Sequence, residues 1–252
     1  MQNPRSILIT GASSGIGRAL ALAYAEPGRT LFLGGRNAER LAAVAAECRA
    51  KGALVETRVG DVGDEAAMKT WIEDAHQMAA LDLVIANAGV SLGYSRDYDL
   101  APHTRTTFAA NVDGVFNTVH PAIRCMTGRG GQIAIMSSLS GFHGLPSSPA
   151  YSASKAAVKS YGEALRGLLA KEGVSVSVIC PGFIESHMTA RNDFPMPFLM
   201  SSDRAAQIIV RGLARAKARI AFPFPMLAMV RLLALLPAAW SDLLLRRAPR
   251  KR

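Results

Sequence analysis

The chain has 252 residues, of which 50% are hydrophobic, and its formal net charge is +10 at pH 7. This length allows one sizeable domain with a substantial core, and the sequence has no low-complexity tract, long linker or solenoid repeat. The positive charge alone is compatible with a nucleic-acid partner. However, no basic stripe is interleaved with aromatic residues, so we predict no nucleic-acid-binding function.

The three cysteines, Cys48, Cys125 and Cys180, form no C-x-x-C pair. Their odd number and wide spacing predict reduced thiols in the cytoplasm, not a disulfide framework. The N-terminus lacks a charged and then apolar leader, which argues against secretion. No cluster of histidine, cysteine and acidic residues has metal-ligand spacing, so we predict no catalytic metal.

Short apolar runs alternate with helical patterns along the chain. Strands are predicted at 6–10, 30–34, 54–58, 83–86, 132–137 and 175–180. Helices are predicted at 15–25, 37–51, 64–79, 104–126, 150–171 and 202–216, with Asn37 and Asp64 as N-caps. This alternation predicts an α/β fold in which helices cover both faces of a parallel sheet.

A glycine-rich turn joins the first predicted strand to the first predicted helix. It reads Gly11-Ala12-Ser13-Ser14-Gly15-Ile16-Gly17. Glycines let the backbone approach phosphates closely, and the following helix offers free N–H groups and a partial positive charge. A lone glycine turn can simply connect two elements, but the strand before it and the helix after it favour a pyrophosphate-binding site.

A tyrosine and a lysine stand four residues apart in the helix predicted at 150–171. The spacing places Tyr151 and Lys155 on one helix face, about one turn apart. A close lysine, helped by a cationic cofactor ring, favours the phenolate and lowers the tyrosine pKa from its usual value of about 10. The phenol then becomes a usable general acid or base. Because such pairs also occur by chance on solvated helices, the interpretation depends on the rest of the chain.

Seven short motifs occur in order along residues 5–190. They are Thr10-Gly11-x-x-x-Gly15-Ile16-Gly17, Asp61-Val62, Asn87-Ala88-Gly89, Asn111-Val112-Asp113-Gly114, Ser137-Ser138, Tyr151-x-x-x-Lys155 and Pro181-Gly182-Phe183-Ile184-Glu185-Ser186. Together they resemble the short-chain dehydrogenase/reductase family. The resemblance implies a Rossmann-type doubly wound α/β fold with about seven strands, the seventh at 219–222, and assembly into a homodimer or homotetramer.

The same resemblance assigns the cofactor contacts. Asp61 and Val62 are expected at the adenine, although a surface-loop aspartate is the alternative for the first of them. The segment Asn87, Ala88 and Gly89 is expected to run beside the cofactor. The remaining expected contacts are Pro181, Gly182, Ile184 and Ser186 near the nicotinamide, and Gly11, Ser13, Ser14, Gly15, Ile16 and Gly17 at the pyrophosphate.

The catalytic roles also follow from the resemblance. Tyr151 is expected to exchange a proton with the substrate oxygen, and Ser138 to hydrogen-bond that oxygen; the spacing to Tyr151 favours Ser138 over the adjacent Ser137. Lys155 is expected to lower the Tyr151 pKa and to bind the nicotinamide ribose. Asn111 is expected to hold a water that links Lys155 to solvent, or else to bond its own helix backbone.

The end of the second predicted strand bears on the choice of cofactor. It reads Leu33-Gly34-Gly35-Arg36-Asn37, so glycine replaces the acidic residue that usually binds the ribose 2′-hydroxyl of NAD(H) in the family. Arg36 can form a bidentate contact with a 2′-phosphate. We therefore predict NADP(H) as the preferred cofactor and NAD(H) as the alternative. Ser14 stands where many NADP-using relatives have a basic residue, and a solvated arginine at a helix start is the other interpretation of Arg36.

Three loops, at 90–100, 141–149 and 185–200, are expected to line the substrate pocket. The third is interpreted as a mobile apolar lid or as an oligomer contact. Its large apolar residues are Met188, Phe194, Met196, Phe198, Leu199 and Met200. His143 and His187 lie in these loops as further candidate substrate contacts or as incidental residues.

The stretch 223–252 is interpreted as a helical extension of the domain at 1–222. Between Ile220 and Leu236 the only charged residue is Arg231, whereas five of the last seven residues are basic. Three prolines divide the apolar run, so a membrane span is not expected. An apolar helical hairpin beside a cationic end is typical of a segment that lies in an anionic membrane surface. Packing on the fold or on a partner subunit is the alternative.

We therefore expect a cytoplasmic NADP(H)-dependent oxidoreductase, with peripheral membrane contact as an option, that interconverts a carbonyl and an alcohol on an apolar small-molecule substrate. A 3-oxoacyl-thioester reductase is the enzymatic alternative. A non-catalytic NADP-binding sensor or scaffold is the alternative of another class. The set of Asn111, Ser138, Tyr151 and Lys155 argues against the scaffold, because a pure binder needs no proton path.

Overall fold

The molecule is built on one seven-stranded parallel sheet in the order β3-β2-β1-β4-β5-β6-β7. The computed structural model describes residues 3–92, 99–186, 189–190 and 195–245. The strands are β1 (Ser6–Ile9), β2 (Thr30–Gly35), β3 (Leu54–Val59), β4 (Leu83–Ala86), β5 (Gly131–Met136), β6 (Val174–Pro181) and β7 (Arg219–Phe222). The predicted Rossmann-type doubly wound sheet is confirmed, and its strand order reverses between β1 and β4.

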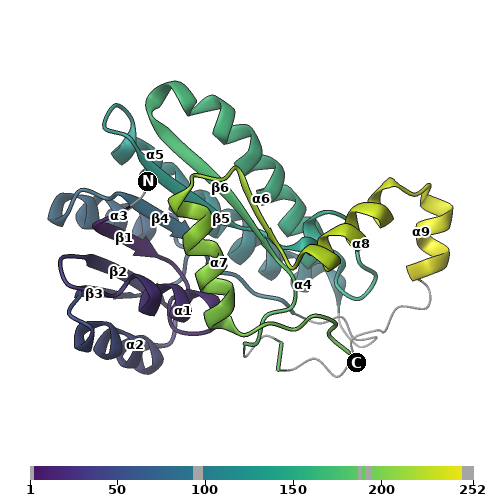
Figure 1. Ribbon diagram of the computed structural model, residues 1–252, viewed down its shortest axis with the longest axis horizontal. Coiled ribbons are helices and arrows are strands. Elements are labelled where there is room, and N and C mark those ends of the chain that lie inside the picture. The colour runs from purple at the N-terminus through teal and green to yellow at the C-terminus, as the bar shows by residue number, and fades with distance from the viewer. Residues whose placement is uncertain (1–2, 93–98, 187–188, 191–194, 246–252) are drawn as a thin grey trace.

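Helices cover both faces of the sheet (Figure 1). They are α1 (Gly15–Tyr24), α2 (Ala38–Ala50), α3 (Glu65–Met78), α4 (Leu100–Phe108), α5 (Gly114–Met126), α6 (Pro149–Leu168), α7 (Ser202–Ala214), α8 (Phe224–Leu235) and α9 (Ala238–Leu245). Short 3₁₀ turns lie at Leu139–Gly141 and Ala170–Glu172. Asn37 and Asp64 cap α2 and α3 as predicted, because their side chains accept hydrogen bonds from the N–H groups of Arg40 and Ala67.

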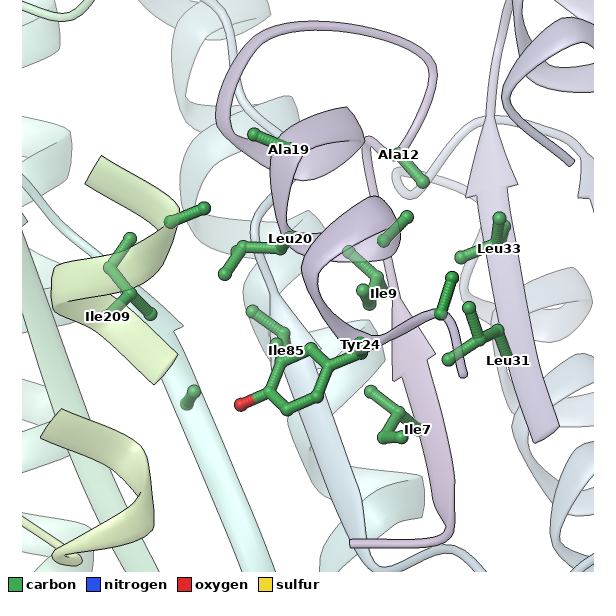
Figure 2. Close-up of a cluster of buried hydrophobic side chains, with 14 of the residues drawn as sticks. Ile7, Ile9, Ala12, Ala19, Leu20, Tyr24, Leu31, Leu33, Ile85 and Ile209 are labelled. Atoms are coloured by element: carbon green, nitrogen blue, oxygen red, sulfur yellow. The ribbon is translucent and has the colours of Figure 1, made fainter. Parts of the chain in front are cut away.

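Alternate residues of each central strand pack into two separate cores. Ile7 and Ile9 of β1 belong to the core under α1, α2 and α7, whereas Leu8 belongs to the core under α3, α5 and α6. Leu20 and Tyr24 of α1 lie over β1 in the first of these cores (Figure 2). A strand covered on both faces needs apolar side chains at successive positions, which is why the central strands read as unbroken apolar runs.

The helix predicted at 104–126 differs most from the structure. The helical segment begins at Leu100, where the Asp99 side chain accepts a hydrogen bond from the N–H of Ala101, and a π-helical turn at Ala109–Asp113 separates α4 from α5. Gly114 follows that turn, and a Cβ there would overlap the Val62 side chain. The π turn therefore sits where the helix packs most closely against the loop after β3.

The C-terminal stretch forms two helices after the edge strand β7, and the proposed domain boundary at 222 falls between β7 and α8. Leu227 of α8 packs with Leu139, Val178 and Cys180 in a third, smaller core cluster. No helix in the described part of the chain is long and apolar enough to cross a membrane.

Candidate active site

A cavity of about 630 Å³ lies at the carboxyl ends of the strands. It is lined by all but one of the predicted site residues: Gly11, Ser13, Ser14, Gly15, Ile16, Gly17, Arg36, Asp61, Val62, Asn87, Ala88, Gly89, Ser138, Tyr151, Lys155, Pro181, Gly182, Ile184 and Ser186. Asn111 is the exception. The loops that follow parallel strands converge at this edge of the sheet, so motifs far apart in sequence line one cavity.

The glycine-rich turn forms a tight cradle that a side chain would fill. Gly11 and Gly15 have φ angles of +68° and +53°, which favour glycine. A Cβ on Gly17 would overlap the carbonyl oxygen of Gly11. Ser14 precedes α1 without a side-chain capping hydrogen bond, so the first N–H groups of the helix remain directed at the cavity. This cradle fits the pyrophosphate of a dinucleotide.

Thr10 joins the cradle to the end of β4, a role that the sequence analysis missed. Its hydroxyl oxygen accepts hydrogen bonds from the backbone N–H groups of Asn87 at 3.0 Å and Ala88 at 3.1 Å. In return, the Asn87 amide donates to the carbonyl oxygens of Thr10 at 2.9 Å and Gly11 at 3.2 Å. The turn and the Asn87–Gly89 segment are therefore held as one preformed unit. A threonine at the end of an apolar strand was the available signal.

Cations gather at the far end of the cavity, beside β2. Arg36 is exposed, and its guanidinium lies 3.7 Å from the Asp61 carboxylate, which also accepts a hydrogen bond from the Gly63 N–H at 2.9 Å. Arg40 and Arg58 line the same end of the cavity. The sequence analysis missed both, although Arg40 lies in the first turn of α2, four residues after Arg36, and Arg58 lies near the end of β3. Three guanidinium groups at one end of the cavity favour an anionic group there.

Ser138, Tyr151 and Lys155 meet at the opposite end. The Ser138 side chain hydrogen-bonds to Tyr151, accepts from the N–H of Ser140 at 3.1 Å and donates to the carbonyl of Pro181 at 3.4 Å. The Lys155 ammonium donates to the carbonyl of Met136 at 2.9 Å and lies 5.7 Å from the centre of the Tyr151 ring.

The two adjacent serines have different positions. Ser137 is buried and donates its hydroxyl hydrogen to the carbonyl of Lys155 at 2.7 Å, so it binds the backbone of α6. Both serines line the cavity, but the Ser137 hydroxyl hydrogen is taken by the Lys155 carbonyl, whereas the Ser138 side chain lies beside the tyrosine. This geometry agrees with the preference for Ser138 that its spacing to Tyr151 indicated.

Burial of both side chains opposes the expected effect of Lys155 on the Tyr151 pKa. Burial raises the pKa of the Tyr151 phenol, and the side-chain hydrogen bond between Tyr151 and Ser138 offsets this only in part. Burial also lowers the pKa of the Lys155 amine to about 8. The predicted lowering of the Tyr151 pKa includes a cationic cofactor ring beside Lys155, so it stays a prediction. The Lys155 ammonium is bonded to the Met136 carbonyl and lies over the Tyr151 ring. A low phenol pKa then depends on the cationic cofactor ring.

The buried lysine gives a testable dependence of stability on pH. Below its folded pKa of about 8, Lys155 is charged in both states, and burial of that charge lowers the free energy of unfolding. As the pH rises from about 8 to 10.5, only the folded state has lost the proton, so the free energy of unfolding recovers by about 3 kcal/mol. Lys155→Met is thus expected to stabilise the cofactor-free protein near about pH 7 by about 2 kcal/mol, allowing about 1 kcal/mol for the lost hydrogen bond.

Urea unfolding of both proteins at about pH 7 and about pH 9.5 measures this effect as a stability difference that shrinks with rising pH. Lys159→Met, one helical turn further along α6, is the control for replacing a lysine of that helix by methionine. A stability difference for Lys155→Met that is the same at both pH values would contradict the prediction.

Asn111 lies in the π turn with a side chain that is fully buried and does not line the cavity. Its amide donates to the carbonyl of Val90 at 2.9 Å and to the Ser154 hydroxyl at 3.0 Å, and its oxygen accepts from the N–H of Val90 at 2.7 Å. The side chain therefore bonds to Val90 and Ser154 and not to its own helix backbone, and the expected contact of Asn111 with a water stays a prediction. Asn111 remains beside Lys155, because a Cβ on Gly89 would lie 2.9 Å from its Oδ1 and 3.3 Å from the lysine Nζ.

An apolar wall of the cavity lies between Tyr151 and α8, and Ser140, Ser147 and Ser148 also line the cavity. Val90, Leu139, Leu145 and Met226 form the wall. Met226 belongs to α8 and was assigned by sequence to the C-terminal extension, and a Cβ on Gly182 would lie 2.8 Å from its sulfur. Of the expected substrate loops, residues 93–98, His187, Met188 and Phe194 lie outside the described residues. In the third loop, Phe198 and Leu199 are exposed, while Met200 is buried and pairs with Ile184.

Comparison with known proteins gives three relevant similarities. A family model described as short chain dehydrogenase matches residues 5–194. An uncharacterised oxidoreductase of Myxococcus xanthus is 39% identical over 248 residues, which cover 96% of this chain and 97% of that protein. A 3β-hydroxysteroid dehydrogenase of Mediterraneibacter gnavus is 33% identical over 209 residues, which cover 82% of this chain and 74% of that protein.

A solved structure resembles the whole chain. It is the short-chain dehydrogenase/reductase of Burkholderia phymatum in complex with NAD, with a TM-score of 0.84 and 26% sequence identity, and the match covers 100% of this chain and 98% of that one. The cavity therefore lies in a fold whose solved relative binds a nicotinamide dinucleotide. The chain belongs to the short-chain dehydrogenase/reductase family and is an NAD(P)-dependent oxidoreductase that acts on an alcohol or carbonyl group.

Proposed function

We propose that the protein is an NADP(H)-dependent oxidoreductase that interconverts an apolar ketone and its secondary alcohol. The observation that carries this proposal is one continuous cavity that has Ser138, Tyr151 and Lys155 at one end and the glycine cradle with Arg36 at the other. A cofactor that binds along this cavity brings its nicotinamide to the tyrosine and its ribose phosphate to the arginines.

In the proposed mechanism, Tyr151 handles the proton. In reduction, the phenol donates its proton to the carbonyl oxygen, and the Ser138 hydroxyl donates a hydrogen bond to the same oxygen as negative charge develops there. Lys155 orients the nicotinamide ribose through hydrogen bonds to its hydroxyls and stabilises the phenolate that remains. When bound, NADP(H) supplies or accepts the hydride. In oxidation, the same phenolate accepts the proton of the alcohol.

The preference for NADP(H) rests on the end of β2. Gly35 replaces the expected acidic residue, and Arg36, Arg40 and Arg58 line that end of the cavity. A 2′-phosphate meets three guanidinium groups here, whereas with a 2′-hydroxyl their only anionic partner among the described residues is Asp61. The Burkholderia phymatum relative was solved with NAD and therefore does not support a preference for NADP(H). The proposed preference rests on the residues of this chain.

The apolar wall supports a ketone or alcohol with an alicyclic or lipid-like body. Val90, Leu139, Leu145 and Met226 offer no charge to a polar substrate. The relative from Mediterraneibacter gnavus is named for a hydroxysteroid, which is a substrate of this kind. We therefore place the reactive oxygen between Ser138 and Tyr151 and the apolar body against this wall.

We also propose a homodimer or homotetramer that acts in the cytoplasm. An aromatic cluster of Phe116, His120 and Tyr161 joins α5 to α6, and His120 is exposed, which supports an interface through these two helices. The three cysteines are free thiols, which supports a reducing compartment.

The test of the proposed function is a cofactor titration followed by turnover. NADPH is expected to bind at least about tenfold more tightly than NADH in a titration of nicotinamide fluorescence, as one charge-assisted contact to the phosphate requires. The NADPH-loaded protein is then expected to reduce alicyclic ketones. Faster reduction of a 3-oxoacyl thioester would favour the acyl-thioester reductase, and tight binding without turnover of either class would favour the scaffold.

A further inference from the structure

The C-terminal helices expose an unusual amount of apolar surface. Of the fourteen large hydrophobic side chains that are exposed in the described residues, seven lie in α8 and α9. They are Phe224, Met229, Leu232, Leu235, Trp240, Leu243 and Leu244. The two helices project from one end of the molecule (Figure 1), so this surface, here called the α8–α9 face, extends beyond the sheet and its covering helices.

The two sides of α8 have different environments. Met226, Leu227 and Val230 pack against the core cluster that contains Leu139 and Cys180. Met229, Leu232 and Leu235 of the same helix are exposed. A helix that is apolar all round is normally covered all round, and here the protein covers only one side. The exposed apolar side of α8 is therefore expected to contact an apolar environment other than the protein's own core.

The charges around the α8–α9 face favour an anionic medium. Arg231 is the only charged residue of α8, and Asp242 is the only acidic residue in 223–252. Five of the seven residues that follow α9 are arginine or lysine. A contact between two copies through α9 would bring two such cationic segments together, which electrostatic repulsion opposes. An anionic lipid surface satisfies both the apolar face and the basic segment.

The α8–α9 face is also continuous with the catalytic cavity through one helix. Met226 lines the cavity and packs against Gly182, while the opposite side of the same helix is exposed and apolar. A helix that lies in a lipid surface with this orientation holds the apolar wall of the cavity next to that surface. Substrates that partition into lipid would then be concentrated beside the active site.

We propose that α8 and α9 lie in the interface of an anionic bilayer with their exposed side chains in the acyl boundary, and that the positive charge of residues 246–252 attracts the anionic headgroups. The protein binds this surface peripherally and takes an apolar ketone or alcohol from it. The surface contact rests on the α8–α9 face and on the basic residues that follow it, whereas the lipid-dissolved substrate class rests on the proposed function.

The test is flotation of the full-length protein with lipid vesicles. Vesicles of phosphatidylcholine that also contain phosphatidylglycerol are expected to carry at least about tenfold more protein than vesicles of phosphatidylcholine alone, because each basic residue near an anionic surface favours binding. High salt is expected to reduce the difference by screening.

Paired glutamate substitutions locate the contact. Leu232→Glu with Leu235→Glu is expected to lower binding to the anionic vesicles at least about tenfold, because two charges would have to enter the acyl boundary. Leu54→Glu with Leu168→Glu is the matched control. Its leucines are 69% and 73% exposed, against 64% and 82% for the first pair, and both lie outside α8 and α9. The control is expected to bind like the wild type.

Three results would overturn the proposal. They are wild-type protein that does not prefer anionic vesicles, loss of vesicle binding to the same extent in both double variants, and wild-type levels of vesicle binding in both double variants. Light scattering in the absence of lipid tests whether a second copy of the protein covers the α8–α9 face instead. A smaller assembly for the Leu232→Glu, Leu235→Glu variant alone would identify the face as an interface between copies and would also overturn the proposal. Turnover of a water-soluble ketone without vesicles reports on the proposed oxidoreductase function separately, since neither leucine lines the cavity.

Discussion

Tyr151→Phe is expected to lower turnover by about 10²- to 10⁴-fold, the range that a positioned general acid or base contributes. The substitution removes only the phenol oxygen, which bonds to Ser138 at the end of the cavity away from the arginines. The glycine cradle is held by Thr10 and Asn87, so NADPH affinity is expected to stay close to that of the wild type. Steady-state turnover of an alicyclic ketone and fluorescence titration of NADPH measure the two quantities.

Tyr161→Phe is the matched control, because Tyr161 lies on the same helix and its hydroxyl bonds to His120 at 2.8 Å. It loses one hydrogen bond but touches neither Ser138 nor the cavity, so its turnover is expected to match the wild type. The proton-transfer role of Tyr151 would be refuted if Tyr151→Phe kept turnover within about tenfold of the wild type. A common loss of turnover and of NADPH affinity would instead indicate a damaged site.

The cofactor side of this site could be predicted from sequence because its signals are local. A strand, a glycine turn and a helix occupy consecutive residues, and φ values of +68° at Gly11 and +53° at Gly15 are the conformations that glycine favours. The strand ends were also predicted, and the cofactor contacts that the family resemblance assigned after β2, β3, β4 and β6 line one cavity.

The contacts that the sequence did not predict join elements that are distant in the chain. The pairing of Asn111 with Val90 depends on the π turn and on the position of α4 beside the loop after β4. Met226 reaches the cavity only because α8 turns back over Gly182 after the edge strand. No local pattern of residues encodes either arrangement, because both depend on how the elements pack.

The shift of the Tyr151 pKa also depends on how the elements pack. The spacing to Lys155 predicts a lowered phenol pKa, since it places a positive charge one turn away. Burial of both groups opposes this by favouring the neutral phenol and the neutral amine. Sequence spacing reports the separation of two residues along a helix, whereas the cost of removing their charges from water depends on the whole fold.

Arg36→Ala is expected to weaken NADPH binding by about ten- to a hundredfold and to leave NADH binding unchanged. The variant removes a charge-assisted contact to the 2′-phosphate of about 1.5 to 3 kcal/mol, which NADH does not make. Arg124→Ala is the matched control, because Arg124 is similarly exposed and also pairs with an acidic residue, Glu73, at 3.8 Å. It does not line the cavity and is expected to leave both affinities unchanged.

Gly35→Asp is also expected to weaken NADPH binding, because it adds a negative charge that repels the 2′-phosphate. Its carboxylate would stand before Arg36 and beside Ser13, where a Cβ on Gly35 comes within 3.2 Å of the serine Cβ and Oγ, so Ser13 must shift slightly. The carboxylate then repels a 2′-phosphate and can accept a hydrogen bond from a 2′-hydroxyl. The variant that combines Gly35→Asp with Arg36→Ala is therefore expected to bind NADH more tightly than NADPH. If the double variant kept the wild-type ratio of the two affinities, the 2′-phosphate would not be recognised at the end of β2.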